Sequence, residues 1–161
     1  MPWIKPVKQK EMKQLNDGAA ATVFDRLLAN EPDTYQAFLP LQKAIKETSL
    51  SDELRELVIT FVSMKNGCEY CTESHSKVLG GLVDQPNLLE WLESYRESDM
   101  KEEWKAVLNY AEKLTAKPVE VTKEDIERLK AGGYDTKEIV EINQTIAYTS
   151  YTNQLSIGLG L

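Results

Sequence analysis

Several features are scarce in this chain of 161 residues, and their scarcity excludes whole classes of protein. The 19 basic residues are outnumbered by 26 acidic ones, and a net charge of -7 argues against a nucleic-acid-binding protein, which would concentrate basic residues. No apolar run approaches the roughly 20 residues that a membrane-spanning helix needs. Residues 1–6 lack the apolar stretch of a signal peptide. We therefore expect a cytoplasmic protein with no nucleic-acid or membrane partner.

Strand-like alternation of apolar and polar residues is also weak, and no repeat or long linker divides the chain. At this length a single domain is the default. We therefore expect one all-α domain over residues 1–161. Apart from a central pair of helices, the pattern predicts helices over residues 17–30, 34–47, 88–95, 102–113, 123–130 and 136–156. Pro32 should end the first of these, and Pro40 should kink or divide the second.

The central pair of helices is predicted from the most apolar segment, residues 52–65. Its apolar residues recur with helical spacing, and no charge occurs over residues 57–64, which is typical of a buried helix. Residues 66–67, Asn-Gly, break this helix, and a second helix covers residues 68–79 before a pair of glycines. The two helices would form a central hairpin with the cysteines at its tip.

Cysteine and histidine are the scarcest reactive residues, and all of them lie within eight positions. Cys68 and Cys71 are the only two cysteines, and His75 is the only histidine. Two thiols spaced C-x-x-C at a helix start can form and reopen an internal disulfide, and the helix N-terminus stabilises a thiolate, the attacking species. His75 lies one turn beyond Cys71 on the same helix face, where it could accept or donate a proton.

Glu56 is a further candidate for this site, provided that the hairpin forms. With a rise of about 1.5 Å per residue, His75 lies roughly 12 Å beyond the turn on one helix and Glu56 roughly 15 Å before it on the other. On its own helix, however, Glu56 points away from the main apolar stripe, as an exposed glutamate would. Its side of the helix also holds three uncharged residues, Ile59, Thr60 and Ser63, which favours a covered position.

Two structural interpretations of the same residues remain open at this point. Free cysteines often pack as small hydrophobic side chains without reacting. Alternatively, Cys68, Cys71, His75 and Glu56 could supply four zinc ligands, although structural zinc sites more often use four cysteines or two cysteines with two histidines. A thioredoxin fold is disfavoured, because no strand–helix pattern surrounds the cysteines.

The spacing E-x11-C-x-x-C-x-x-x-H resembles the alkylhydroperoxidase D-like (carboxymuconolactone decarboxylase-like) family. Glu56, Cys68, Cys71 and His75 occupy its four positions. The neighbouring segments are similar to the family as well, and the ends of the chain resemble its peroxidase-related branch, through residues 2–5, 24–28, 153–155 and 158–160.

The resemblance implies an all-α fold that assembles into dimers, trimers or hexamers and reduces peroxides with its thiols. Cys71 would be the peroxidatic cysteine, and Cys68 the resolving cysteine that also meets the external dithiol reductant. Glu56 and His75 would form a proton relay. In the best-known relative the reductant is a lipoyl group on a protein. We predict no bound cofactor and no metal ion.

Tyr70 departs from that relative, in which a second relay histidine lies between the two cysteines. A phenol is a poor proton acceptor at neutral pH, so we expect weaker peroxidase activity or a different substrate. Two alternatives to a thiol peroxidase remain within the same fold. One is a non-catalytic redox sensor, and the other is a carboxymuconolactone decarboxylase-like lyase, whose chemistry needs no thiol pair.

Overall fold

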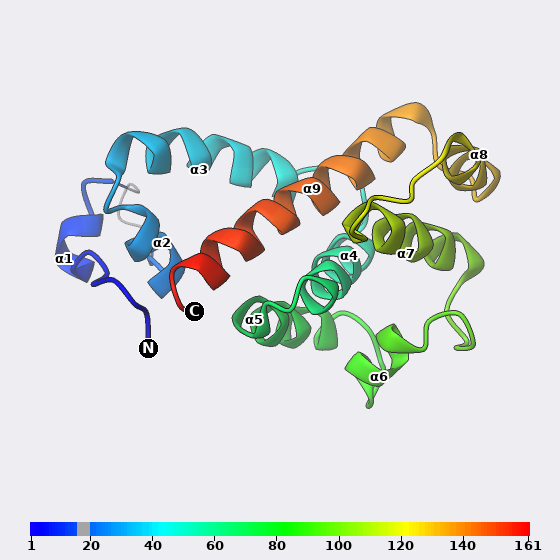
Figure 1. The fold of residues 1–161 in the computed structure, drawn as a ribbon, viewed down its shortest axis with the longest axis horizontal. Coiled ribbons are helices and arrows are strands. Elements are labelled where there is room, and N and C mark those ends of the chain that lie inside the picture. Colours follow the sequence, from blue (N-terminus) through cyan, green and yellow to red (C-terminus); the bar gives the residue numbers. More distant parts are fainter. Residues whose placement is uncertain (16–19) are drawn as a thin grey trace. The chain divides into compact units, whose positions relative to one another are not determined.

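The computed structural model describes residues 1–15 and 20–161, and the regular structure of these residues is entirely helical (Figure 1). In chain order the helices are α1 (Gln9–Met12), α2 (Val23–Leu28), α3 (Pro32–Lys46), α4 (Asp52–Lys65), α5 (Glu69–Gly80), α6 (Leu88–Glu93), α7 (Glu102–Thr115), α8 (Lys123–Ala131) and α9 (Thr136–Gly158). The all-α prediction is therefore confirmed. Along the same described residues, no helix has the length and hydropathy needed to cross a membrane.

The chain divides into two compact units, which are described separately. The hairpin unit comprises Ser49–Gln154, and the terminal unit comprises Met1–Thr48 together with Leu155–Leu161. That residues 1–161 act as a single domain stays a prediction.

The core of the hairpin unit is built around α4, which is buried on nearly every side. Leu57, Val58, Phe61 and Val62 have no exposed surface, and the small polar residues of the same helix are equally buried. The ring of Phe61 meets that of Tyr95 edge to face, with centroids 5.4 Å apart. The uncharged run therefore marks a buried helix, as its pattern indicates.

The turn between α4 and α5 has the form that the Asn-Gly pair predicts. Asn66 caps the C-terminus of α4, and Gly67 follows with φ of 71°, in the left-handed region where a side chain would add strain. Cys68 is the N-cap of α5. The two helices pack against each other (Figure 1), so the predicted hairpin with the cysteines at a helix start is confirmed.

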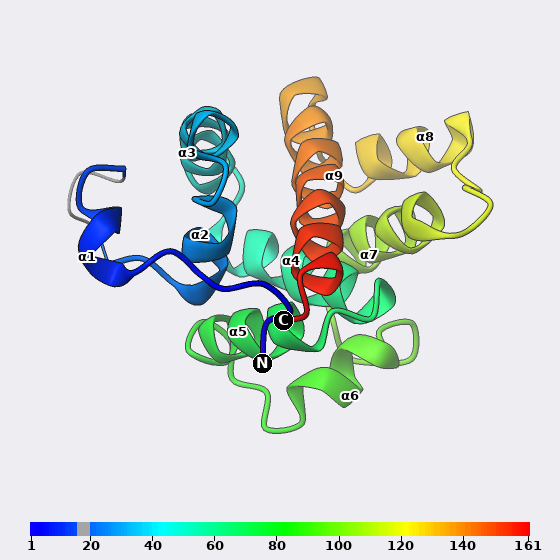
Figure 2. The ribbon, with the colours of Figure 1, turned by 60° about the vertical axis from the view of Figure 1, so that its left-hand side comes forward.

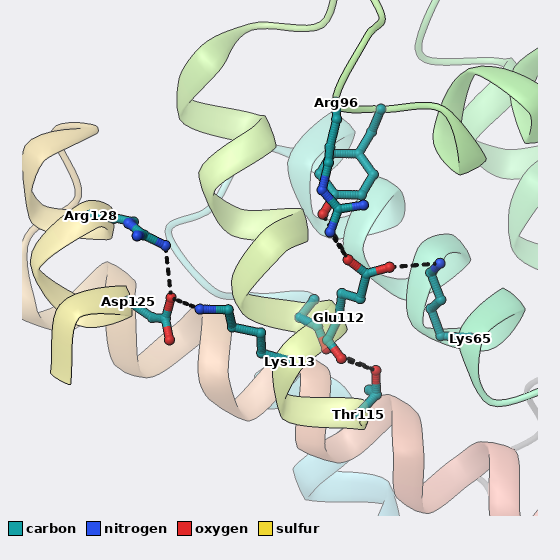
Figure 3. Close-up of polar contacts among 9 residues, drawn as sticks. Lys65, Arg96, Glu112, Lys113, Thr115, Asp125 and Arg128 are labelled. Atoms are coloured by element: carbon teal, nitrogen blue, oxygen red, sulfur yellow. Dashed lines mark hydrogen bonds and ion pairs between the residues drawn. The ribbon is translucent and has the colours of Figure 1, made fainter. Parts of the chain in front are cut away.

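A charged cluster ties α4 to α7, which lies beside both α4 and α8 (Figure 2). Glu112 on α7 accepts from Lys65 at the end of α4 at 2.9 Å, from Arg96, and from the hydroxyl of Tyr95 at 3.0 Å. Figure 3 shows its carboxylate between the two basic side chains. Lys65 is three residues before Cys68. The cluster therefore also holds the end of α4, where the turn that leads to Cys68 begins.

A second cluster joins α7 to α8 in the same unit. The carboxylate of Asp125, only 1% exposed, accepts from Lys113 at 2.6 Å and from Arg128 at 3.3 Å (Figure 3). It also accepts from the backbone N–H of Thr122 at 2.9 Å, which fixes the first turn of α8. Although burial raises the pKa of Asp125, the hydrogen bonds from Lys113 and Thr122 hold it below its usual value. The buried carboxylate therefore stays charged.

Replacing Glu112 with glutamine should lower the free energy of unfolding at neutral pH by about 1–2 kcal/mol, because two cations lose a charged acceptor. Although burial raises its pKa, hydrogen bonds from Lys65, Arg96 and Tyr95 hold the pKa of this carboxyl group below its usual 4.5. Such a group stabilises the fold above pH 4.5, and that contribution is lost as pH falls through the folded-state pKa.

Denaturant titrations of wild type and Glu112→Gln should therefore converge on acidification below pH 4.5. The matched control is Glu127→Gln, which removes an exposed ion pair on α8 and should cost under about 1 kcal/mol at any pH. A loss at Glu112 that is no larger than the control's, or that persists unchanged in acid, would contradict this role.

In the terminal unit, the helices differ from the sequence prediction at their starts. The helix expected from Asp17 begins at Val23, after Thr22 forms a capping box with Asp25; Asp17 itself lies outside the described residues. Pro32 was expected only to end the preceding helix, but it is the first residue of α3. Proline is favoured at this position of a helix.

Pro40 was expected to kink or divide the helix that contains it, and the prediction of a division is wrong. The helix α3 runs through Pro40 without a break in its assignment. Its partly buried side packs against α2, where the rings of Phe24 and Phe38 meet with centroids 6.1 Å apart. Packing of this kind can outweigh the loss of one backbone hydrogen bond.

Candidate redox site

The two cysteines of the hairpin unit are joined to each other. Cys68 and Cys71 form a disulfide, with their Cα atoms 5.3 Å apart. Cys68 is the N-cap of α5, and its Sγ accepts a hydrogen bond from the backbone N–H of Cys71 at 3.3 Å. Its own N–H donates to the carbonyl of Ser63 at 3.0 Å, across the turn from α4. The C-x-x-C spacing therefore places both sulfurs within bonding reach at the start of a helix.

Glu56 on α4 faces His75 on α5. Its Oε2 lies 2.7 Å from Nδ1 of His75, so the two side chains are hydrogen bonded. The Glu56 side chain is only 14% exposed, whereas that of His75 is 37% exposed. The depth estimated from helical rise is confirmed, and the interpretation of Glu56 as an exposed glutamate is wrong. Packing of α5 over that side of α4 is the reason.

The four candidate residues thus lie in one place on two helices. Cys71 is one helical turn before His75 on α5, and His75 in turn meets Glu56 across the hairpin. Once the disulfide is reduced, a carboxylate, an imidazole and a thiol in this order can pass a proton to or from a sulfur. Which steps they carry out remains a proposal, developed below.

The side chains that anchor the turn before Cys68 could not be recognised from the sequence. Asn153 on α9 is only 1% exposed; its Nδ2 donates to Oγ of Ser63 at 3.1 Å, and its Oδ1 accepts from Nδ2 of Asn66 at 3.0 Å. Asn66 also donates to Oγ of Ser150 at 3.1 Å. One buried amide therefore holds the last turn of α4 and its C-cap, from which the turn to Cys68 begins. No local pattern reveals this, because the partners are about ninety positions apart.

Asn153→Ala should lower the free energy of unfolding by about 1–3 kcal/mol, since Ser63 and Asn66 are left without their buried partner. It should also speed alkylation of the reduced cysteines, because the turn that carries Cys68 loses its anchor. Asn143→Ala is the matched control, since this amide on the same helix donates to Tyr110 at 2.7 Å and does not reach the turn. Equal alkylation rates in the two variants would contradict the anchoring role.

The zinc interpretation receives no support from the side-chain geometry. Among residues 1–15 and 20–161, no group of three or more His, Cys, Asp or Glu side chains is arranged so that it could hold a metal ion. The interpretation of Cys68 and Cys71 as two separate packed thiols is wrong, because the sulfurs are bonded.

Comparison with known proteins finds a family model that matches the segment holding this site. The model of the carboxymuconolactone decarboxylase family matches residues 32–82, the segment that contains Glu56, both cysteines and His75. The resemblance inferred from the sequence is thereby confirmed. The uncharacterized protein YdfG of Bacillus subtilis is 25% identical over 130 residues, which cover 80% of this chain and 88% of YdfG.

Two solved structures are similar over nearly the whole chain. An alkylhydroperoxidase AhpD core, an uncharacterized peroxidase-related protein from Ralstonia eutropha JMP134, is 25% identical, with a TM-score of 0.77 over 94% of this chain and 82% of its own. The debrominase Bmp8, in complex with 2,3,4-tribromopyrrole, gives a TM-score of 0.86 at 21% identity, over 98% of this chain and 89% of its own. The second likeness establishes the fold alone. The AhpD-like fold is therefore shown, and together with the family match it supports a peroxidase-related or decarboxylase-like function.

Proposed function

We propose that the chain is a thiol-dependent, alkylhydroperoxidase-like oxidoreductase. The observation that carries the proposal is a Cys68–Cys71 disulfide one helical turn from a histidine that is hydrogen bonded to a carboxylate at 2.7 Å. A lyase has no use for this thiol pair. Paired sulfurs with an adjacent proton relay are what reversible thiol chemistry requires.

The cycle begins with the reduced protein. His75, held by Glu56, takes the proton of Cys71, and the Cys71 thiolate attacks the O–O bond of a hydroperoxide. The leaving alkoxide takes that proton from His75 and departs as the alcohol, and Cys71 becomes a sulfenic acid. Cys68 then attacks the Cys71 sulfur, water leaves, and the disulfide forms. The S–S bond between residues 68 and 71 corresponds to this oxidised state.

The remaining assignments follow the family resemblance. A dithiol, such as a lipoyl group on a protein, would reduce the disulfide and close the cycle. The chain would act as a homo-oligomer in the cytoplasm, without a bound cofactor. Tyr70 takes no proton in this scheme, so the relay consists of Glu56 and His75 alone. A lower rate with simple hydroperoxides than in relatives with a second histidine is expected.

Steady-state turnover separates the enzyme from a redox sensor. Excess hydroperoxide with a dithiol should give many turnovers per chain, measured as loss of the dithiol, whereas a sensor would form its disulfide once and stop. A muconolactone and 2,3,4-tribromopyrrole, the compound bound in the Bmp8 structure, serve as alternative substrates in the same buffer. Turnover of a muconolactone by a variant lacking both cysteines would favour the lyase.

A further inference from the structure

We propose that Asn153 on α9 is a positioning residue for the redox pair, which raises the effective concentration of the two thiols and so stabilises the Cys68–Cys71 disulfide. The inference rests on the proposed function only for the use of that disulfide. It goes beyond the anchoring of the turn, because it assigns to a buried amide an effect on a redox equilibrium. It holds whichever cysteine meets the peroxide.

Within α5 itself, Cys68 is held only weakly. Cys71 lies inside the helix, whereas Cys68 is its N-cap, with φ of -87° and ψ of 91°, outside the helical region. The capping atom is a sulfur, which accepts the N–H of Cys71 at 3.3 Å in place of the oxygen that an N-cap usually provides. Sulfur is a weak acceptor, and helix ends fray, so the position of Cys68 in the reduced protein depends on contacts outside α5.

The last turn of α4 supplies such a contact. The N–H of Cys68 donates to the carbonyl of Ser63 at 3.0 Å, across the turn that joins the two helices. Ser63 has no exposed surface and lies on the side of α4 that α9 reaches. The place of Cys68 beside Cys71 therefore follows the place of Ser63.

Asn153 fixes this last turn of α4 with both ends of one amide. Its Nδ2 donates to Oγ of Ser63 at 3.1 Å, and its Oδ1 accepts from Nδ2 of Asn66, the C-cap of α4, at 3.0 Å. Asn153 is only 1% exposed, so water cannot replace it when it is lost. A single side chain of α9 thus holds the segment to which Cys68 is bonded.

Two restraints on the same segment reinforce each other. Forming the S–S bond costs the freedom that the reduced thiols have, and a segment that is already fixed has less freedom to lose. By linkage the effect is reciprocal, so the disulfide must strengthen the contacts of Asn153 by the same factor as these contacts strengthen the disulfide. An amide that only stabilised the fold would contribute equally to oxidised and reduced protein and leave the equilibrium unchanged.

Exchange with glutathione measures the effective concentration of the pair. One protein thiolate attacks oxidised glutathione and releases a glutathione thiolate, and the second protein thiolate attacks the mixed disulfide and releases the other. The protein loses two electrons and two protons, and oxidised glutathione becomes two thiols. The equilibrium constant of this exchange has units of concentration and is the effective concentration of the two cysteines.

The proposed peroxidase cycle gives the positioning a use. A sulfenic acid that meets its partner thiol at once closes to the disulfide. One that waits can react with a second peroxide and become a sulfinic acid, which thiols do not reduce. Holding Cys68 in place favours the first outcome.

The test compares this equilibrium constant in wild type and Asn153→Ala, in glutathione buffers without peroxide. Free thiols are trapped with N-ethylmaleimide and counted by intact mass. We expect the constant to fall at least about fivefold in Asn153→Ala, the lower end of typical coupling between two sites. The matched control is Asn143→Ala, whose amide on the same helix binds Tyr110 instead of the turn, and it should stay within about twofold of the wild type.

Ser63→Ala keeps the test decisive if Asn153→Ala does not fold. It retains the backbone carbonyl that holds Cys68 and removes only the hydroxyl that Asn153 binds. Because the contact of Asn153 with Asn66 remains, the expected fall is smaller, at least about twofold, in the same direction. A constant in Ser63→Ala that equals or exceeds the wild-type value overturns the proposal.

Denaturant titrations of oxidised and reduced protein give a readout that a packing role would not move. A fivefold change corresponds to about 1 kcal/mol, so Asn153→Ala should lose about 1 kcal/mol more unfolding free energy as the disulfide than as the dithiol. Equal losses in the two states, or a glutathione equilibrium within about twofold of the wild type, overturn the proposal and leave the proposed function intact. If the wild-type pair forms no disulfide in any glutathione buffer, both fail.

Discussion

Replacing Cys71 with serine should abolish peroxide-dependent oxidation of a dithiol, lowering kcat/KM by at least about a thousandfold. The thiolate is the species that attacks the peroxide, and a serine hydroxyl does not ionise at neutral pH. Although this residue keeps only 7% of its surface exposed, the two side chains are similar in size, so little packing should change. Steady-state kinetics with a hydroperoxide and a dithiol make the measurement.

Cys68→Ser is the informative partner of that variant. It keeps the attacking sulfur but removes the one that resolves the sulfenic acid, so one equivalent of peroxide should be consumed without turnover. A sulfenic acid on Cys71 should then be trapped with dimedone and located by mass spectrometry. Full turnover by Cys71→Ser, or a trapped sulfenic acid on Cys68 in that variant, would contradict the assigned roles.

The second large effect is expected at Glu56. Glu56→Gln keeps the shape of the side chain and can still hydrogen bond to His75, but it removes the charge that makes the pair a proton relay. We expect kcat/KM to fall by about a hundredfold, near the lower end of general acid–base effects, because the residue acts through the histidine. The pH dependence of kcat/KM should also change, which loss of packing alone would not produce.

Glu53→Gln is the matched control for this substitution. It lies on the same helix one turn earlier and is hydrogen bonded to none of the four site residues in the structure. Its kcat/KM and pH profile should match those of the wild type. If Glu56→Gln behaves like Glu53→Gln in both respects, the relay assignment is wrong, although the 2.7 Å contact with His75 would stand.

The hairpin and its site could be predicted because their determinants are local. An uncharged run over residues 57–64, an Asn-Gly turn and a C-x-x-C spacing lie within one stretch. The rise per residue of a helix then gives which residues of the two helices lie opposite each other. That reasoning correctly placed Glu56 beside His75. It could not decide from the helix pattern alone whether Glu56 is exposed, since burial depends on the neighbouring helix.

The supporting contacts could not be predicted, because they join distant segments. Asn153 reaches Ser63 and Glu112 reaches Lys65 only after α9 and α7 have packed on α4. Helix starts in the terminal unit were also misplaced. The helix expected from Asp17 begins only at Val23, where Thr22 and Asp25 provide a capping box whose strength a pattern of apolar residues does not reveal.

A count of free thiols before and after one equivalent of hydroperoxide tests the central claim most directly. The reduced protein should have two free thiols per chain, one on each cysteine of the sequence. After peroxide it should have none, with a mass lower by two hydrogens and a peptide map that joins Cys68 to Cys71. Addition of a dithiol should restore both thiols. Two thiols that persist after peroxide, or that disappear through added oxygen without a disulfide, would contradict a redox-active pair at this site.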